Sequence, residues 1–119
     1  MMGNTPTRCL VFSLLLATGC GQRQQTVLGQ TPDGVVRTVA SVLGPDARGH
    51  VVVRGVMVEK CPVAGCWLRV QDGTGSIKVD TKSAGFVVVD VPLRREVTVA
   101  GTVVIRGQEH MLEARGLRY

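Results

Sequence analysis

The sequence predicts an all-β domain built as a small closed barrel of five strands. Apolar and polar residues alternate with a period of two along most of the chain, and glycine-containing turns separate the alternating runs. The apolar positions are rich in valine, whose branched side chain favours strands. With 119 residues, the chain has room for one domain and a signal segment.

The clearest strand signal is a hairpin over residues 67–80. Residues 67–71 place Leu68 and Val70 on one face, and residues 76–80 repeat the pattern with apolar side chains at 77 and 79. The intervening turn, residues 72–75, supplies glycine where positive φ is needed and an aspartate that can bond nearby amides. We therefore expect two antiparallel strands, each with one buried face.

Three further strands are expected at residues 50–59, 96–106 and 110–118. Gly55 and Gly101 interrupt the first two and indicate a bulge or a sharp bend. Three successive strands, a longer crossover and a final hairpin suit a Greek-key barrel of the OB type, with a short helix or loop between strands three and four. The alternative is a five-stranded sandwich fragment, which would leave its edges exposed.

The stretch before the first strand, residues 33–44, supports two interpretations. Thr38 can N-cap a short helix over residues 39–43 that Gly44 ends. The β-branched valines of this stretch favour a strand instead.

The N-terminus has the features of a processing signal. Arg8 precedes an apolar run, residues 9–16, that is too short to span a bilayer. The run ends in small residues before Cys20, which resembles the bacterial lipoprotein signal, in which the cysteine is acylated and becomes the mature N-terminus. An ordinary cleaved signal peptide is the alternative. We expect a lipoprotein signal peptide at residues 1–19, a flexible tether with lipidated Cys20 at residues 20–34, and the barrel domain at residues 35–119.

These features predict a monomeric protein of the cell envelope, anchored by lipid and facing the periplasm or the extracellular side. Gly21 is not the aspartate that retains lipoproteins, so by analogy with lipoprotein sorting we favour the outer membrane. Signal removal takes away Arg8 and no acid, which lowers the formal net charge from +5 to +4. The basic residues are scattered rather than arranged in a stripe, so no nucleic-acid partner is expected.

Two cysteines remain in the mature domain, Cys61 and Cys66. In an oxidising compartment, two thiols so close in sequence are expected to form a disulfide, worth roughly 2 kcal/mol through loop closure. The alternatives are a soft-metal site and a labile redox pair, although the spacing is wider than C-x-x-C. His50 and His110 are the only histidines, and the sequence brings neither beside the cysteines, so no metal ligand set is predicted.

The candidate ligand-binding residues are Trp67, Arg69 and Lys78, which share the outer face of strands two and three. OB proteins bind ligands on this face. Trp67 could stack on a sugar, a peptide or a base, while the two cations hold an anionic group; the alternative is a tryptophan that only covers the barrel rim. No catalytic residues or cofactor motif are visible. We therefore expect a non-catalytic binding module for an unknown protein or cell-envelope ligand. The alternatives are a metal-binding or thiol-redox protein that uses Cys61 and Cys66, and an OB-fold nucleic-acid binder, which the expected compartment disfavours.

Several motifs resemble a family of small bacterial OB-type proteins. They are V-x-V-x-G at residues 51–55, Gly-Cys-Trp-Leu at 65–68, D-G-T-G-x-I-x-V at 72–79, Gly-Phe at 85–86, Pro92, and V-x-V-x-G-T-V at 97–103. Members of that family are mostly secreted or lipid-anchored, and their function is unassigned. The Gly-Cys-Trp core is the most specific element. The resemblance implies the fold and the compartment, and it carries over no catalytic residue.

Overall fold

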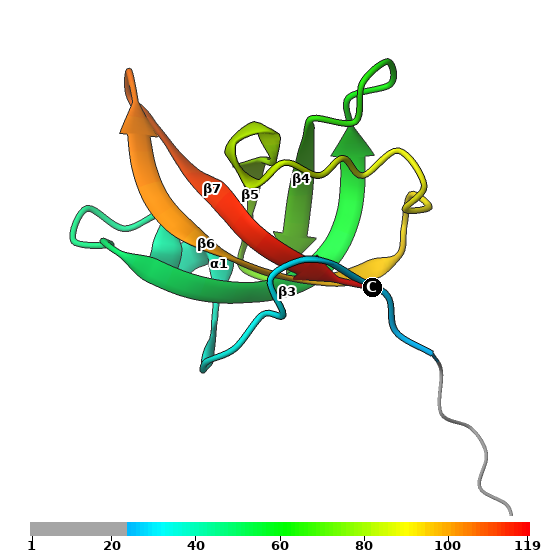
Figure 1. Cartoon of the computed structure of the whole chain (residues 1–119). Coiled ribbons are helices and arrows are strands. Elements are labelled where there is room, and N and C mark those ends of the chain that lie inside the picture. Colours follow the sequence, from blue (N-terminus) through cyan, green and yellow to red (C-terminus); the bar gives the residue numbers. More distant parts are fainter. Residues whose placement is uncertain (1–23) are drawn as a thin grey trace, which may run out of the picture.

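The computed structural model describes residues 24–119, which form a closed five-stranded barrel (Figure 1). The barrel strands are β3 (His50–Lys60), β4 (Trp67–Asp72), β5 (Gly75–Asp80), β6 (Glu96–Arg106) and β7 (Glu109–Arg118). They pair in the order β3-β4-β5-β7-β6, and β6 returns to β3 and closes the barrel. Only the β5–β7 contact within the barrel is parallel. A short 3-10 helix, η2 (Lys82–Ala84), follows β5, so the predicted OB-type architecture is confirmed.

The barrel interior is filled by the apolar positions that alternation predicted. Side chains fully buried there, with relative exposure under 2 %, include Met57, Leu68, Val70, Ile77, Val79, Leu112 and Leu117. In the crossover between β5 and β6, Val88 and Val91 are buried and Phe86 packs against the core. Ile105 has an inward position by alternation but is 49 % exposed, because it lies beside the tip of the β6–β7 hairpin.

The ambiguous stretch before β3 contains both of the elements considered for it. β2 (Val36–Arg37) pairs in parallel with β3, and α1 (Val39–Val42) follows it directly. The Thr38 hydroxyl accepts a hydrogen bond from the Ser41 amide at 3.2 Å, as an N-cap does. The helix prediction is therefore correct except at its last residue, since α1 ends at Val42. The strand considered for this stretch is confined to the two residues of β2.

The chain before residue 35 differs from the prediction. β1 (Val27–Gly29) pairs antiparallel with β7, and Thr26 and Tyr119 exchange two backbone hydrogen bonds of 2.7 and 2.9 Å. Leu28 also packs against the core. The prediction of a flexible tether is therefore wrong from residue 26 onward. The sequence pattern did not indicate β1 because its partner strand, β7, lies at the far end of the sequence. The predicted signal peptide and Cys20 lie outside the described residues.

No helix among residues 24–119 has the length and apolar character needed to cross a membrane.

The loop between β3 and β4 is held against the crossover. Gly65 has φ +62°, and its carbonyl accepts a hydrogen bond from the Val88 amide at 2.8 Å. A Cβ at Gly65 would lie 2.8 Å from the Val89 backbone nitrogen, so this position requires glycine. The Lys60 ammonium donates to the Val91 carbonyl at 2.6 Å. These contacts fix the cysteine loop at the rim of the candidate site.

Candidate ligand-binding face

The strand register brings the three predicted ligand residues onto one face. In the β4–β5 pair, Trp67 lies opposite Asp80, and Arg69 lies opposite Lys78. Directly opposed residues on antiparallel strands point to the same side of a sheet. The neighbouring residues Leu68, Val70, Ile77 and Val79 are buried, so this shared side is the outer one. We call it the ligand face.

The predicted cations differ in how freely they are available. The Lys78 ammonium lies 5.0 Å from the centre of the Trp67 ring, a cation–π arrangement. Arg69 instead lies between two carboxylates, with its Nε 3.4 Å from Glu59 Oε1 and its Nη2 4.0 Å from Glu109 Oε2. Among the described residues, Lys78 makes no ion pair, so it is the cation more available to an anionic group of a ligand.

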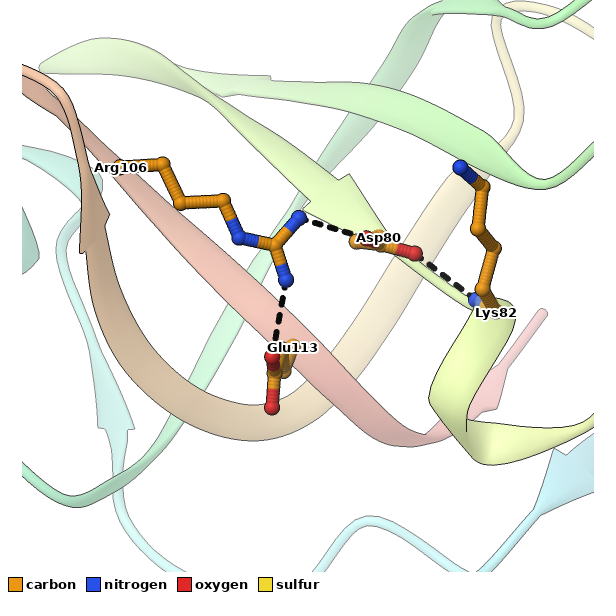
Figure 2. Close-up of polar contacts among 4 residues, drawn as sticks. All are labelled: Asp80, Lys82, Arg106 and Glu113. Atoms are coloured by element: carbon orange, nitrogen blue, oxygen red, sulfur yellow. Dashed lines mark hydrogen bonds and ion pairs between the residues drawn. The ribbon is translucent and has the colours of Figure 1, made fainter.

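A charged network that sequence reasoning missed lies beside these residues (Figure 2). The Arg106 guanidinium forks between two carboxylates: Nη1 is 2.9 Å from Asp80 Oδ2, and Nη2 is 2.8 Å from Glu113 Oε2. The other Asp80 oxygen accepts the Lys82 amide at 2.8 Å. The network therefore connects the ends of β5 and β6 with β7 and η2.

The ionisation of Asp80 reflects its surroundings. Its side chain is only 11 % exposed, and burial alone raises the pKa of this carboxyl. The hydrogen bonds from the Lys82 amide and the Arg106 guanidinium outweigh burial and hold the pKa of Asp80 below its ordinary value. The hydrogen bonds that Arg106 donates to Asp80 and Glu113 raise the pKa of the guanidinium further. Asp80 and Arg106 are therefore both charged near neutral pH.

Two hollows flank the Arg106–Glu113 pair. One, of about 100 Å³, is lined by Cys66, Trp67, Lys78, Asp80, Lys82, Arg106 and Met111. The other, of about 400 Å³, is lined by Gly29, Gln30, Ser83, Ala84, Thr102, Glu113, Ala114 and Arg115. The two hollows are neighbours. In η2, Lys82 lines the smaller one and the next residue, Ser83, lines the larger one. Arg106 lines the smaller hollow and is hydrogen-bonded to Glu113, which lines the larger one. The larger hollow lies within the range typical of small-molecule sites.

The two cysteines are free thiols in the structure, so the predicted disulfide is not formed there. The Cys61 sulfur accepts a hydrogen bond from the Ala64 amide at 3.5 Å. This contact, followed by one from the Val63 amide, lowers the pKa of the Cys61 thiol to about 7. Within residues 24–119, no group of three His, Cys, Asp or Glu side chains could hold a metal ion. At neutral pH the Cys61 side chain is therefore partly in the reactive thiolate form.

The lowered pKa predicts selective alkylation of Cys61. We expect its reaction with iodoacetamide to reach half its maximal rate near pH 7, because the thiolate is the reacting form. Alkylation followed over a pH series by peptide mass spectrometry measures this midpoint for Cys61 alone. Urea-unfolded protein is the control, in which the midpoint should rise toward 9.0. Equal midpoints in the two states would contradict the role of the loop amides.

The closed barrel and its charged outer face define the class of this protein as an OB-fold protein. No protein-family model and no curated protein matches the chain. Among solved structures, the hypothetical protein YgiW from E. coli is 25 % identical, with a TM-score of 0.50, over 72 % of this chain and 90 % of that one. A Replication Protein A heterotrimer bound to single-stranded DNA gives a TM-score of 0.50 at 17 % identity, over 77 % and 70 % of the two chains. The second likeness is one of fold alone.

Proposed function

We propose that this protein is a lipid-anchored binding module of the cell envelope, without catalytic chemistry, that captures its ligand or partner on the ligand face as a monomer. The observation that carries the proposal is the position of Trp67 and Lys78 in one hollow on the outer face of a closed OB barrel. The outer membrane is the proposed site of anchoring, through Cys20.

The charge balance of the ligand face favours a polar ligand over a polyanion. Its arginines are paired with acids, Arg69 with Glu59 and Glu109, and Arg106 with Asp80 and Glu113. A polyanion would meet these carboxylates as well as the cations, and would find one stacking aromatic, Trp67, where single-stranded nucleic-acid sites use several. A ligand with one carboxylate or phosphate beside hydroxyl or amide groups suits Lys78, Trp67 and the adjoining hollows better.

Trp67 is the only tryptophan, so its fluorescence reports on the ligand face directly. We would titrate the protein with acidic, basic and neutral peptides, with neutral and acidic oligosaccharides, and with oligothymidylate. We expect a saturable change with one polar class. Trp67→Ala should then abolish binding of the fluorescently labelled form of that probe, since the variant removes the stacking surface, while the melting temperature stays close to that of the unchanged protein.

The matched control is Arg48→Ala, which changes an exposed residue between α1 and β3 and removes the same charge as Arg69→Ala. Lys78→Ala should weaken binding by roughly tenfold, the cost of one charge-assisted hydrogen bond. Arg69→Ala should weaken it less, because Glu59 and Glu109 already pair with that guanidinium, and the control should not weaken it. If Trp67→Ala lowered the stability of the fold as much as it lowered probe binding, Trp67 would have a structural role instead of a binding one. A failure of every probe to bind would overturn the proposal.

We also propose that Cys61 and Cys66 form a disulfide after export. The loop is short, and both thiols are partly exposed. Native mass spectrometry of protein exported to an oxidising compartment should show a domain lighter by two hydrogens and free of metal. Thiols that persist there would favour the second candidate function, a thiol-redox protein, which the lowered pKa of Cys61 supports. A bound metal ion would favour the metal alternative instead.

A further inference from the structure

We propose that four arginines at the end of the barrel where the described chain begins, Arg54, Arg94, Arg95 and Arg118, form a surface that lies against the anionic phosphates of a membrane. We call these residues the arginine surface. They belong to three separate parts of the sequence, and only the fold brings them together. The inference rests on the proposed lipid anchor for the orientation of the barrel, but attraction of this surface to anionic lipid does not depend on acylation.

Two of the arginines share one row of the sheet. Thr98 on β6 is paired with Arg54 on β3 and with Arg118 on β7, and Arg118 is paired in turn with Val27 on β1. Residues paired in this way point to the same side of the sheet. Arg54 Nε also donates to the Thr98 hydroxyl at 3.4 Å. The two arginines therefore flank one threonine on the outer side of the sheet, and Thr98 itself is buried at 6 % exposure.

The other two arginines reach the same place from the loop before β6. The Arg94 amide donates to the Met57 carbonyl at 2.8 Å, and Arg94 lines one hollow with Arg54. The Arg95 guanidinium lies 5.6 Å from the centre of the Tyr119 ring, next to Arg118 in the sequence. Arg54 and Arg94 are exposed.

The surface has the composition that a phosphate-bearing interface favours. None of its four arginines makes an ion pair with another described residue, unlike Arg69 and Arg106 on the ligand face. The acidic groups near it are Asp72 and Glu96, which line the hollow that Arg54 and Arg94 also line. Guanidinium binds phosphate in a bidentate fashion. Val27 and Leu93 beside it are 40 % and 51 % exposed, which suits contact with the interface.

The position of the chain entry argues for a membrane as the occupant. Thr26 is hydrogen-bonded to Tyr119, so the preceding residues join the barrel beside the arginine surface. If Cys20 carries lipid, residues 21–25 can span at most about 17 Å. The barrel end that holds Tyr119 is therefore kept close to the headgroups. The arginines there, which make no ion pair with described residues, lie close to the lipid phosphates.

This placement turns the ligand face away from the bilayer. Thr98 marks the arginine surface and Arg106 the ligand face, and the eight residue steps from one to the other along β6 correspond to about 26 Å of strand. Figure 1 shows the C-terminus and the entering chain at one end of the barrel, and the β6–β7 tip and η2 away from that end. Membrane contact would therefore leave the hollows around Trp67 open to the compartment.

The test uses the full chain with Cys20→Ser, which removes the acylation site. Its partition onto vesicles of phosphatidylcholine and phosphatidylglycerol in equal parts is compared with that onto phosphatidylcholine alone. We expect Arg94→Gln/Arg118→Gln to lower partition onto the anionic vesicles by roughly 25-fold, at about one factor of five per arginine. Arg54 and Arg95 are left unchanged because they contact Thr98 and Tyr119. Binding to phosphatidylcholine alone, through the apolar N-terminal run, should be equal in all variants.

The matched control is Arg48→Gln/Lys82→Gln, which removes the same charge from exposed positions elsewhere. Equal losses in the two double variants, or no preference for anionic vesicles, would overturn the proposal. Tighter binding to oligothymidylate than to vesicles through the same arginines would assign the surface to nucleic acid instead. A mass measurement of exported wild-type protein tests the lipid anchor separately. Absence of acylation with retained vesicle binding would refute the anchor in the proposed function and leave the attraction of the arginine surface to anionic lipid in place.

Discussion

Gly101→Ala is expected to lower the free energy of unfolding by about 3 kcal/mol, because overpacking a rigid backbone is among the costlier single changes. A Cβ at this position would lie 2.5 Å from the Glu113 carbonyl oxygen and 3.0 Å from its carbon. Both atoms are backbone, so no side-chain rotation relieves the contact. The register of β6 and β7 also shifts between Ala100 and Gly101, which marks the bulge that lets β7 approach so closely.

Urea unfolding, followed by Trp67 fluorescence, measures the effect. Gly73→Ala is the matched control: it adds the same methyl group in a turn where nothing lies within 4 Å of the new Cβ. We expect the control to change stability by less than about 0.5 kcal/mol. A similar loss in both variants would mean that alanine is costly at these positions for reasons other than contact with β7.

Much of the barrel could be predicted because its signals are local. Valine alternation and the Asp72-Gly73-Thr74-Gly75 turn define strands within a few residues, and these boundaries agree with the structure to within one residue. Interior glycine also indicated the bulge at Gly101 correctly. β1 could not be predicted, since its three residues hold no pattern of their own and their partners lie far along the chain: Leu28 pairs with Leu117, 89 residues away.

In the candidate site, too, the contacts within one hairpin could be predicted, and the contacts between distant strands could not. Trp67, Arg69 and Lys78 lie on one hairpin, so alternation alone places them on one face. Asp80 meets Arg106 only because β5 pairs in parallel with β7 and β7 pairs in turn with β6, and a single sequence does not encode that register visibly. A charged residue near the end of each of these strands was the available signal, but it does not specify the partner.

The same physical difference separates the two charged regions of the molecule. On the ligand face, each arginine lies within 4.0 Å of carboxylates. These ion pairs fix the positions of the arginines and cancel most of their electrostatic field in the surrounding solvent. On the arginine surface, no such carboxylate holds the side chains, and their field extends into solvent within a Debye length of about 8 Å. A fixed, balanced face suits selective capture, whereas an unbalanced one suits attraction to a charged plane.

Asp80→Asn is expected to lower the free energy of unfolding by about 2 kcal/mol at pH 7, the worth of a charge-assisted hydrogen bond to a largely buried carboxylate. The variant keeps the size of the side chain and can still accept the Lys82 amide, but it removes the negative charge opposite Arg106. Because Asp80 holds η2 and the β6 tip in place, binding of the probe found for the ligand face should weaken as well. Glu113→Gln is the control; its carboxylate is 38 % exposed, so we expect less than about 1 kcal/mol.

The pH dependence distinguishes loss of the charge from loss of packing. The folded pKa of Asp80 lies below its ordinary value of 3.8, so its contribution is fully present above that pH and is lost as the pH falls through the folded pKa. Wild-type protein and Asp80→Asn should therefore differ by about 2 kcal/mol at neutral pH and converge in strongly acidic solution, where both side chains are neutral. Urea midpoints measured at steps from pH 7 downward test this. A stability difference that stays constant to the lowest pH would show that the Asp80 charge contributes nothing and that the asparagine merely fits the site less well.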